Sequence, residues 1–264
     1  MLGKLLKYDL KWTYKLLAVL YCLAFIFSVI AYVFNRTENS MLFDVLGKIA
    51  NGFAVSMTVS ALINCIMRSW ARFVKNVYKD ESYLTHTLPV SKNTIYSAKI
   101  LSAIICTFTT IVVAAICIVM CYCNEEEMIN DLKNMLEITA SSFDSSVIGI
   151  LLIFFLVLLL EIIEVLFAGY TGIIIGHRSN KSKMLKSIII GFAIYMATNI
   201  ISIAFMYIAG LFNPDIMNLI TTTSSLDINI VKGIMVYGII FYMVFNIIFY
   251  TISKWQFNKG VNVD

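Results

Sequence analysis

Six long apolar runs constrain the fold of this chain more than any other feature of its sequence. Each has about 20 or more mostly apolar residues, the length of helix needed to cross a hydrocarbon core about 30 Å thick. The only prolines, Pro89 and Pro214, lie outside the runs, so neither breaks a helix there. The apolar–polar alternation of membrane β-barrels is absent. The runs are Leu16–Phe34, Leu42–Met67, Ile100–Cys121, Val147–Ile175, Ser187–Phe212 and Ile230–Ile252.

Composition agrees with this pattern. Of the 264 residues, 60% are hydrophobic and only 14% are charged, whereas a soluble domain has about 25% charged residues. The sequence therefore predicts an all-α polytopic membrane protein, with six transmembrane helices in a single domain that covers residues 1–264.

The basic residues predict an orientation for these spans. With six spans both termini lie on one side, and if that side is cytoplasmic, 16 of the 20 Lys and Arg are in inner segments; Arg36, Lys48, Lys133 and Lys232 are the other four. Loops rich in Lys and Arg remain cytoplasmic. The largest outer loop, Asn124–Ser146, is instead acidic. We expect both termini to be cytoplasmic, and we attribute the net charge of +4 to this topology, with no nucleic-acid partner.

The first 15 residues carry two stripes at helical spacing. Lysines occupy positions 4, 7, 11 and 15, and leucines occupy positions 2, 6 and 10. This pattern predicts an amphipathic helix in the inner interface, with its leucines in lipid and its lysines near anionic headgroups. The alternative is a simple positive flank to the first span. Both interpretations place the segment on the inner side, in contact with membrane lipids.

The sequence contains no recognisable catalytic or cofactor motif. A phosphate-binding loop is absent, so we expect no ATP hydrolysis by this chain. Its two histidines, His86 and His177, lie between the apolar runs, which argues against a histidine metal site inside the membrane. Cys117, Cys121 and Cys123 cluster near the end of the third run, but their spacing fits no zinc pattern. We predict a protein that is not an enzyme and holds no metal or cofactor of its own.

Glu161 and Glu164 are the acidic pair within an apolar run. They lie three residues apart on one helical face, roughly 16–22 Å from the inner end of the span. Charge at that depth is costly, so such residues face protein or a water-filled cavity. One hypothesis is that both line a translocation path or pair with a cationic partner across a subunit interface. The other is that one is a protonated structural carboxyl hydrogen-bonded to a neighbouring helix.

The polar segment between the second and third runs, residues 68–99, is the largest inner loop. Its first part has good helix formers and should extend the second span, after which Glu81–Leu88 makes a turn. Pro89 prevents a helix from continuing through Leu88, and Ser91 is a suitable N-cap for the helix that follows. Tyr83, Leu84 and Leu88 would then be apolar side chains at an exposed tip, which is typical of a docking surface.

Residues 78–101, "YKDESYLTHTLPVSKNTIYSAKIL", resemble the first cytoplasmic loop of permease subunits of bacterial ABC transporters of the type-2 exporter class. The family's run of Tyr-Leu-x-x-Thr-Leu-Pro-Val-Ser is followed by a Ser/Ala-Lys-Ile/Leu-Leu entry to the third span. The matching residues are Tyr83, Leu84, Thr87, Leu88, Pro89, Val90 and Ser91, then Ala98, Lys99, Ile100 and Leu101. The six-span layout and the amphipathic N-terminal helix are also similar to that family.

The resemblance implies a function. In that family this loop couples the permease to a separate ATPase subunit, which binds ATP and Mg²⁺, and two permease subunits form the path. We therefore expect a permease subunit of an ATP-driven exporter in the bacterial plasma membrane, paired with a second copy or another permease. The alternative is a secondary carrier or a membrane scaffold protein without an ATPase partner. A carrier should contain internal repeats with broken helices, which the sequence does not show.

Overall fold

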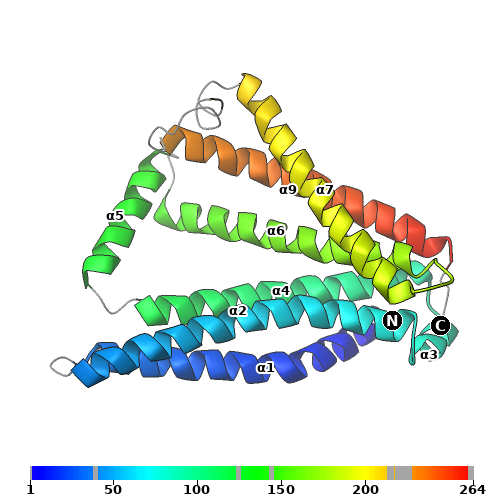
Figure 1. Ribbon diagram of the computed structural model, residues 1–264, viewed down its shortest axis with the longest axis horizontal. Coiled ribbons are helices and arrows are strands. Elements are labelled where there is room, and N and C mark those ends of the chain that lie inside the picture. The colour runs from blue at the N-terminus through cyan, green and yellow to red at the C-terminus, as the bar shows by residue number, and fades with distance from the viewer. Residues whose placement is uncertain are drawn as a thin grey trace. The chain divides into compact units, whose positions relative to one another are not determined.

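Long helices make up most of the described chain. The computed structural model describes residues 2–37, 41–122, 126–142, 146–212, 217 and 228–260. Figure 1 shows helices throughout this part of the chain. Their bounds are α1 Leu2–Asn35, α2 Met41–Val77, α3 Ser82–Thr87, α4 Lys92–Tyr122, α5 Glu126–Ser142, α6 Val147–Gly176, α7 Lys183–Phe212 and α9 Ile228–Asn258.

The structure confirms the prediction of an all-helical fold with six helices of sufficient length and apolar composition to span a membrane. Within the described ranges, six helices are long and apolar enough to cross a membrane: α1, α2, α4, α6, α7 and the Gly233–Asn258 part of α9. The helices exceed the apolar runs at their ends. In particular, α1 continues without interruption from the amphipathic segment into the first span, and α2 extends ten residues beyond Met67 to Val77.

The chain divides into two compact units. Unit 1 comprises Met1–Asn76 and Tyr83–Asn134, and unit 2 comprises Val77–Ser82 and Met135–Asp264. The chain therefore leaves unit 1 at the end of α2 and returns to it at the second residue of α3. That both units form the single domain expected from the sequence stays a prediction.

Unit 1 is built from α1, α2 and α4, which alternate in direction (Figure 1). Small side chains allow the helices to approach: Ala31, Ala50, Ala54 and Cys121 form one buried cluster. Phe27 on α1 stacks on Phe53 of α2, with ring centroids 5.3 Å apart. Tyr14 and Tyr21 of α1 make hydroxyl hydrogen bonds to threonines of α4, at 2.7 and 2.5 Å. Aromatic and hydroxyl contacts thus fix α1 on its two neighbours.

Unit 2 is centred on α6, which packs against both α7 and α9. A Cβ atom added to Gly172 would lie 2.5 Å from the Cα of Gly191, and one on Gly176 would collide with Ser187. This small-residue face of α6 is therefore occupied by α7 of the same chain, and not by another subunit. Close backbone approach of this kind is a common basis of helix packing in membranes.

A further helix interrupts the segment predicted to be the large acidic outer loop. α5 spans Glu126–Ser142 within the predicted loop Asn124–Ser146. Its residues up to Asn134 belong to unit 1 and those from Met135 to unit 2. The segment between the fifth and sixth spans, residues 213–216 and 218–227, lies outside the described residues.

Candidate functional site

The loop between α2 and α4 leaves several apolar side chains exposed. The short helix α3 exposes Tyr83 and Leu84, with 78% and 67% of their surface accessible, and Leu88 just after it is 41% exposed. The smaller polar residues Ser82 and Thr85 are the buried ones. This distribution reverses the usual one, in which a surface helix buries its apolar face. The tip therefore carries an exposed apolar cluster, and its role as a docking surface stays a prediction.

The sequence determines the conformation of this tip through two local signals. Pro89 lies directly before α4, where the chain cannot continue α3 as a helix. Ser91 caps α4 as predicted: its Oγ accepts a hydrogen bond from the backbone N–H of Thr94 at 3.2 Å and lies 2.9 Å from Thr94 Oγ1. Thr87 and Pro89 are exposed, and Val90 is half-buried. Of the eleven residues that match the family, the seven from Tyr83 to Ser91 lie in α3 and in the segment before α4; that they contact an ATPase stays a prediction.

A buried ion cluster joins the helices on both sides of the tip to α1. Asp9 of α1 is 3% exposed, and its Oδ1 accepts hydrogen bonds from Lys99 Nζ of α4 at 2.6 Å and from Arg72 Nε of α2 at 3.1 Å. Lys99 Nζ also donates to Asn76 Oδ1 of α2, at 2.7 Å. Asp9 Oδ2 is buried without a hydrogen-bond partner among the described residues. One carboxylate oxygen thus connects three helices in unit 1.

Trp12 extends this cluster by one helical turn along α1. The guanidinium of Arg68 lies 4.2 Å from the ring centroid of Trp12 and donates to its backbone oxygen at 2.9 Å. The guanidinium of Arg72 lies 5.2 Å from the same ring. Arginine packs favourably on an indole face, most strongly where water is excluded. The N-terminal part of α1 is therefore attached to the base of the loop through both charge and aromatic contacts, while its position in the membrane interface stays a prediction.

The residues that follow α2 are held separately, in unit 2. The ring of Tyr78 stacks on His177 at the end of α6, with centroids 4.2 Å apart, and Tyr78 is 2% exposed. Burial raises the pKa of the Tyr78 phenol, so this side chain remains neutral at physiological pH. His177 Nδ1 lies 3.0 Å from Ser187 Oγ of α7 and 2.9 Å from the Ile173 carbonyl oxygen. The chain entering the loop thus has a fixed attachment to α6.

The structure separates the two glutamates of α6. Glu164 is 4% exposed and its Oε1 accepts a hydrogen bond from Thr198 Oγ1 of α7 at 2.6 Å. Glu161, one turn earlier, is exposed. Asn246 of α9 donates to the Leu160 carbonyl oxygen at 3.0 Å on the same stretch of α6. The two carboxylates therefore differ in environment, and their joint role in a translocation path stays a prediction.

The sequence did not predict that Asp9 and Lys99 belong to a buried ion cluster. Asp9 is the only acidic residue among the first 15, and this isolation within a basic segment was the available signal. Lys99 belongs to the motif that carries the resemblance, but nothing local indicates that it is buried against residue 9. Its burial, at 7% exposure, is a consequence of the packing of α1 on α4.

No metal centre is formed by the described residues. No group of three or more His, Cys, Asp or Glu side chains within those ranges could hold a metal ion. Cys117 and Cys121 are buried free thiols, and Cys123 lies outside the described residues. Cys121 Sγ instead contacts Ser28 Oγ at 3.5 Å, in the packing of α1 on α4.

Comparison with known proteins identifies no relative: no family model, no curated protein and no solved structure matches this chain.

Proposed function

We propose that this chain is the permease subunit of an ATP-driven ABC exporter, coupled through residues 68–99 to a separate ATPase. The observation that carries the proposal is the exposed apolar tip formed by Tyr83, Leu84 and Leu88. Solvent-exposed apolar clusters of this kind mark protein-interaction sites. The ATPase is the partner suggested by the loop's resemblance to type-2 exporters, and the absence of a phosphate-binding loop from this sequence fits a separate ATP-hydrolysing subunit.

The anchoring of the loop supports this function. A coupling element must transmit movement, so its flanking helices have to be connected firmly to the membrane-spanning helices. Asp9 connects α2 and α4 to α1, and Tyr78 connects the chain beyond α2 to α6. Displacement of the tip would therefore act on helices of both units. The second oxygen of Asp9 provides an acceptor for a rearranged set of bonds after such a displacement.

Two such permease subunits, this chain and a second copy or a related partner, would form the translocation path. Glu161 is our candidate for a path-lining or interface residue because it is exposed on an apolar helix. A carboxylate in the middle of a span requires water or a polar partner. Glu164 already has Thr198 as its partner, so we assign it mainly to helix packing. The distribution of basic residues favours cytoplasmic termini, and the resemblance to bacterial permeases favours a bacterial plasma membrane.

The experiment that tests the function is co-purification with the cognate phosphate-loop ATPase, which we expect to be encoded beside this gene. We expect Tyr83→Ala with Leu88→Ala to retain the thermal stability of the parent, since both side chains are exposed. Truncating an interface anchor commonly costs about 2 kcal/mol or more, roughly 30-fold in affinity. The variant should therefore recover little ATPase and show reduced transport. Tyr8→Ala with Met67→Ala, which removes exposed side chains elsewhere in unit 1, is the matched control. Undiminished ATPase recovery and transport by the loop variant would refute the proposal.

A further inference from the structure

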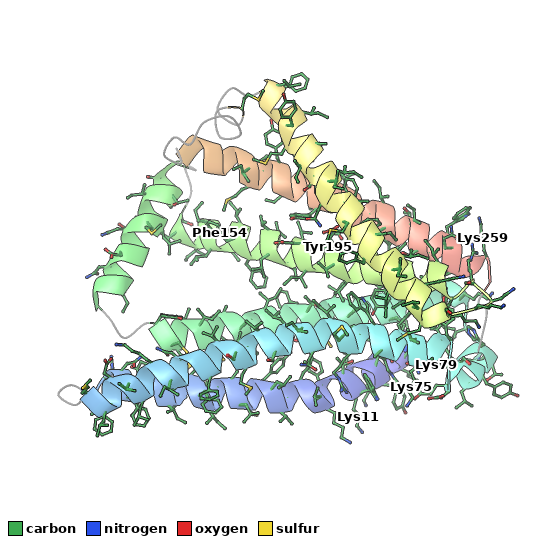
Figure 2. The ribbon with its side chains drawn as sticks, viewed as in Figure 1. Lys11, Lys75, Lys79, Phe154, Tyr195 and Lys259 are labelled. Atoms are coloured by element: carbon green, nitrogen blue, oxygen red, sulfur yellow. The ribbon has the colours of Figure 1, made fainter. Side chains whose placement is uncertain are left out.

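A shallow basic recess lies at the end of unit 2 where α7 begins. It is lined by residues from three separate segments: Lys79 beyond α2, His177 at the end of α6, and Asn180, Ser182, Lys183, Met184 and Leu185 at the start of α7. Figure 2 labels Lys79 and Lys259, both at this end of the unit. None of the lining residues is acidic; Asp80 and Glu81 follow Lys79 in the chain but do not line the recess.

Three features of the recess favour an anion. Lys79 and Lys183 contribute two cationic side chains from segments about 100 residues apart in the sequence. The recess includes the first turn of a 30-residue helix, where backbone N–H groups and the helix dipole favour negative charge. The amide of Asn180 and the hydroxyl of Ser182 add hydrogen-bond donors. Lysine ammonium groups and helix N-termini are both recurrent partners of phosphate.

The recess is also shaped by its own local structure. Ser182 has a φ of 53°, in the left-handed region that non-glycine residues seldom adopt. Its carbonyl oxygen accepts the first helical hydrogen bond of α7, from the Lys186 N–H at 3.0 Å. His177, at the recess wall, is fixed by Ser187 Oγ at 3.0 Å and by the ring of Tyr78. Unfavourable backbone conformations of this type are concentrated at functional sites.

Apolar side chains decide which phosphate-bearing anion fits. Met184 and Leu185 line the same recess and are 51% and 59% exposed. They lie in the first turn of a helix long and apolar enough to cross a membrane, so they are placed where acyl chains begin. A free phosphate ion would use the lysines and leave these side chains in water. A phospholipid would contact both.

We propose that this recess binds the headgroup of an anionic phospholipid, with its phosphate on Lys79, Lys183 and the α7 N-terminus and its acyl chains on Met184 and Leu185. Basic pockets beside transmembrane helices are a known means of headgroup recognition. The site requires only that α7 crosses the membrane. It is independent of any ATPase partner, so the failure of either proposal leaves the other testable.

The test is native mass spectrometry of the purified full-length protein, titrated with phosphatidylglycerol, phosphatidylcholine or inorganic phosphate. We expect saturable binding of phosphatidylglycerol in preference to the other two. Lys79→Gln with Lys183→Gln should weaken that binding about 30-fold, since each lysine near an anionic lipid contributes about a five-fold factor. Lys181→Gln with Lys254→Gln removes the same charge from the same unit without altering the recess lining, and should retain the parent's affinity.

Each remaining outcome has a defined meaning. Equal losses in the recess variant and its control would show general charge attraction and overturn the site. If inorganic phosphate binds the recess as tightly as phosphatidylglycerol does, the bound phosphate need not come from a lipid, and the proposal of a lipid site is overturned. Should the double variant unfold, Lys79→Gln alone serves in its place, because Lys79 is exposed and lies outside the helices; unchanged lipid binding by that variant would refute the proposal.

Discussion

The loop end of unit 1 and the α6 contacts of unit 2 hold their helices together by different chemistry. At the loop end of unit 1, the contact between α1, α2 and α4 is ionic, with Asp9 buried between Arg72 and Lys99. In unit 2, the described contacts of α6 are small-residue packing and hydrogen bonds: glycine backbone against α7, Glu164 with Thr198 of α7, and Thr171 Oγ1 within 2.6 Å of Ser253 Oγ on α9. Buried ion pairs have strict geometric requirements and contribute little net stability. Small-residue packing instead depends on shape alone.

This difference suggests separate roles for the two kinds of contact. A charge cluster whose carboxylate uses only one oxygen can exchange partners between two arrangements, provided that the charges stay paired. A glycine interface has a single close-packed arrangement. The ionic contact lies where the loop between α2 and α4 joins those helices, and the glycine contact lies between two consecutive helices of unit 2. We infer that unit 1 contains the adjustable contact and that the α6–α7 pair moves as one body.

Removing the negative charge of Asp9 should have the largest effect on stability. We expect Asp9→Asn to destabilise the protein by about 3–5 kcal/mol, because it leaves buried cations without their carboxylate. Thermal unfolding in detergent measures the change. The matched control is Asp44→Asn, which breaks an exposed i,i+4 pair with Lys48 at 2.9 Å and should cost below about 1 kcal/mol. Equal effects of the two substitutions would show that the buried cluster has no special structural role.

Overpacking the glycine interface should have an intermediate effect. A Cβ at Gly172 would meet the backbone of α7 at Gly191 and Ser187, at 2.5 and 2.8 Å. We expect Gly172→Ala to cost about 1–3 kcal/mol, the usual penalty for overpacking. Gly238→Ala on α9 is the control, since nothing lies within 4 Å of its Cβ, and alanine should stabilise that helix by up to about 1 kcal/mol. The same thermal measurement compares them; if Gly172→Ala is as stable as Gly238→Ala, the α6–α7 packing described above is wrong.

Substitution of Glu161 should have the smallest effect on stability. Comparing it with substitution of Glu164 distinguishes the roles of the two glutamates. Glu161→Gln should leave thermal stability unchanged, because the side chain is exposed, yet reduce transport if it lines the path. Glu164→Leu removes a buried group hydrogen-bonded to Thr198 and should cost about 1 kcal/mol. Transport in vesicles, normalised to inserted protein, separates the two roles. Full transport by Glu161→Gln would remove it from the path.

The features that were predictable from the sequence depend on local chemistry. Apolar length predicted six spanning helices, and the Pro89–Ser91 pair predicted the start of α4, because capping involves only neighbouring residues. α5 was missed because its polar composition gives no apolar run, although its residues are compatible with a helix.

The features that were not predictable depend on tertiary contacts. Asp9 and Lys99 are 90 residues apart in the chain, and no periodicity indicates that they pair. Glu161 and Glu164 share a helical face by spacing, yet a rotation of about 60° separates residues three apart. That rotation is enough to place Glu164 against Thr198 while Glu161 remains exposed. The packing of α7 on the glycines of α6 decides which of the two glutamates is buried.

We propose that the exposed tip of α3 touches an ATPase, and photo-crosslinking measures that contact directly. Benzoylphenylalanine would replace Leu84, which is 67% exposed, and, in a separate control, Trp255, an exposed residue near the end of α9. We predict that position 84 crosslinks to the co-expressed ATPase, with a yield that changes when ATP is bound, and that position 255 does not. Absence of a crosslink at position 84 in a complex that hydrolyses ATP, or equal crosslinking at both positions, would contradict the account.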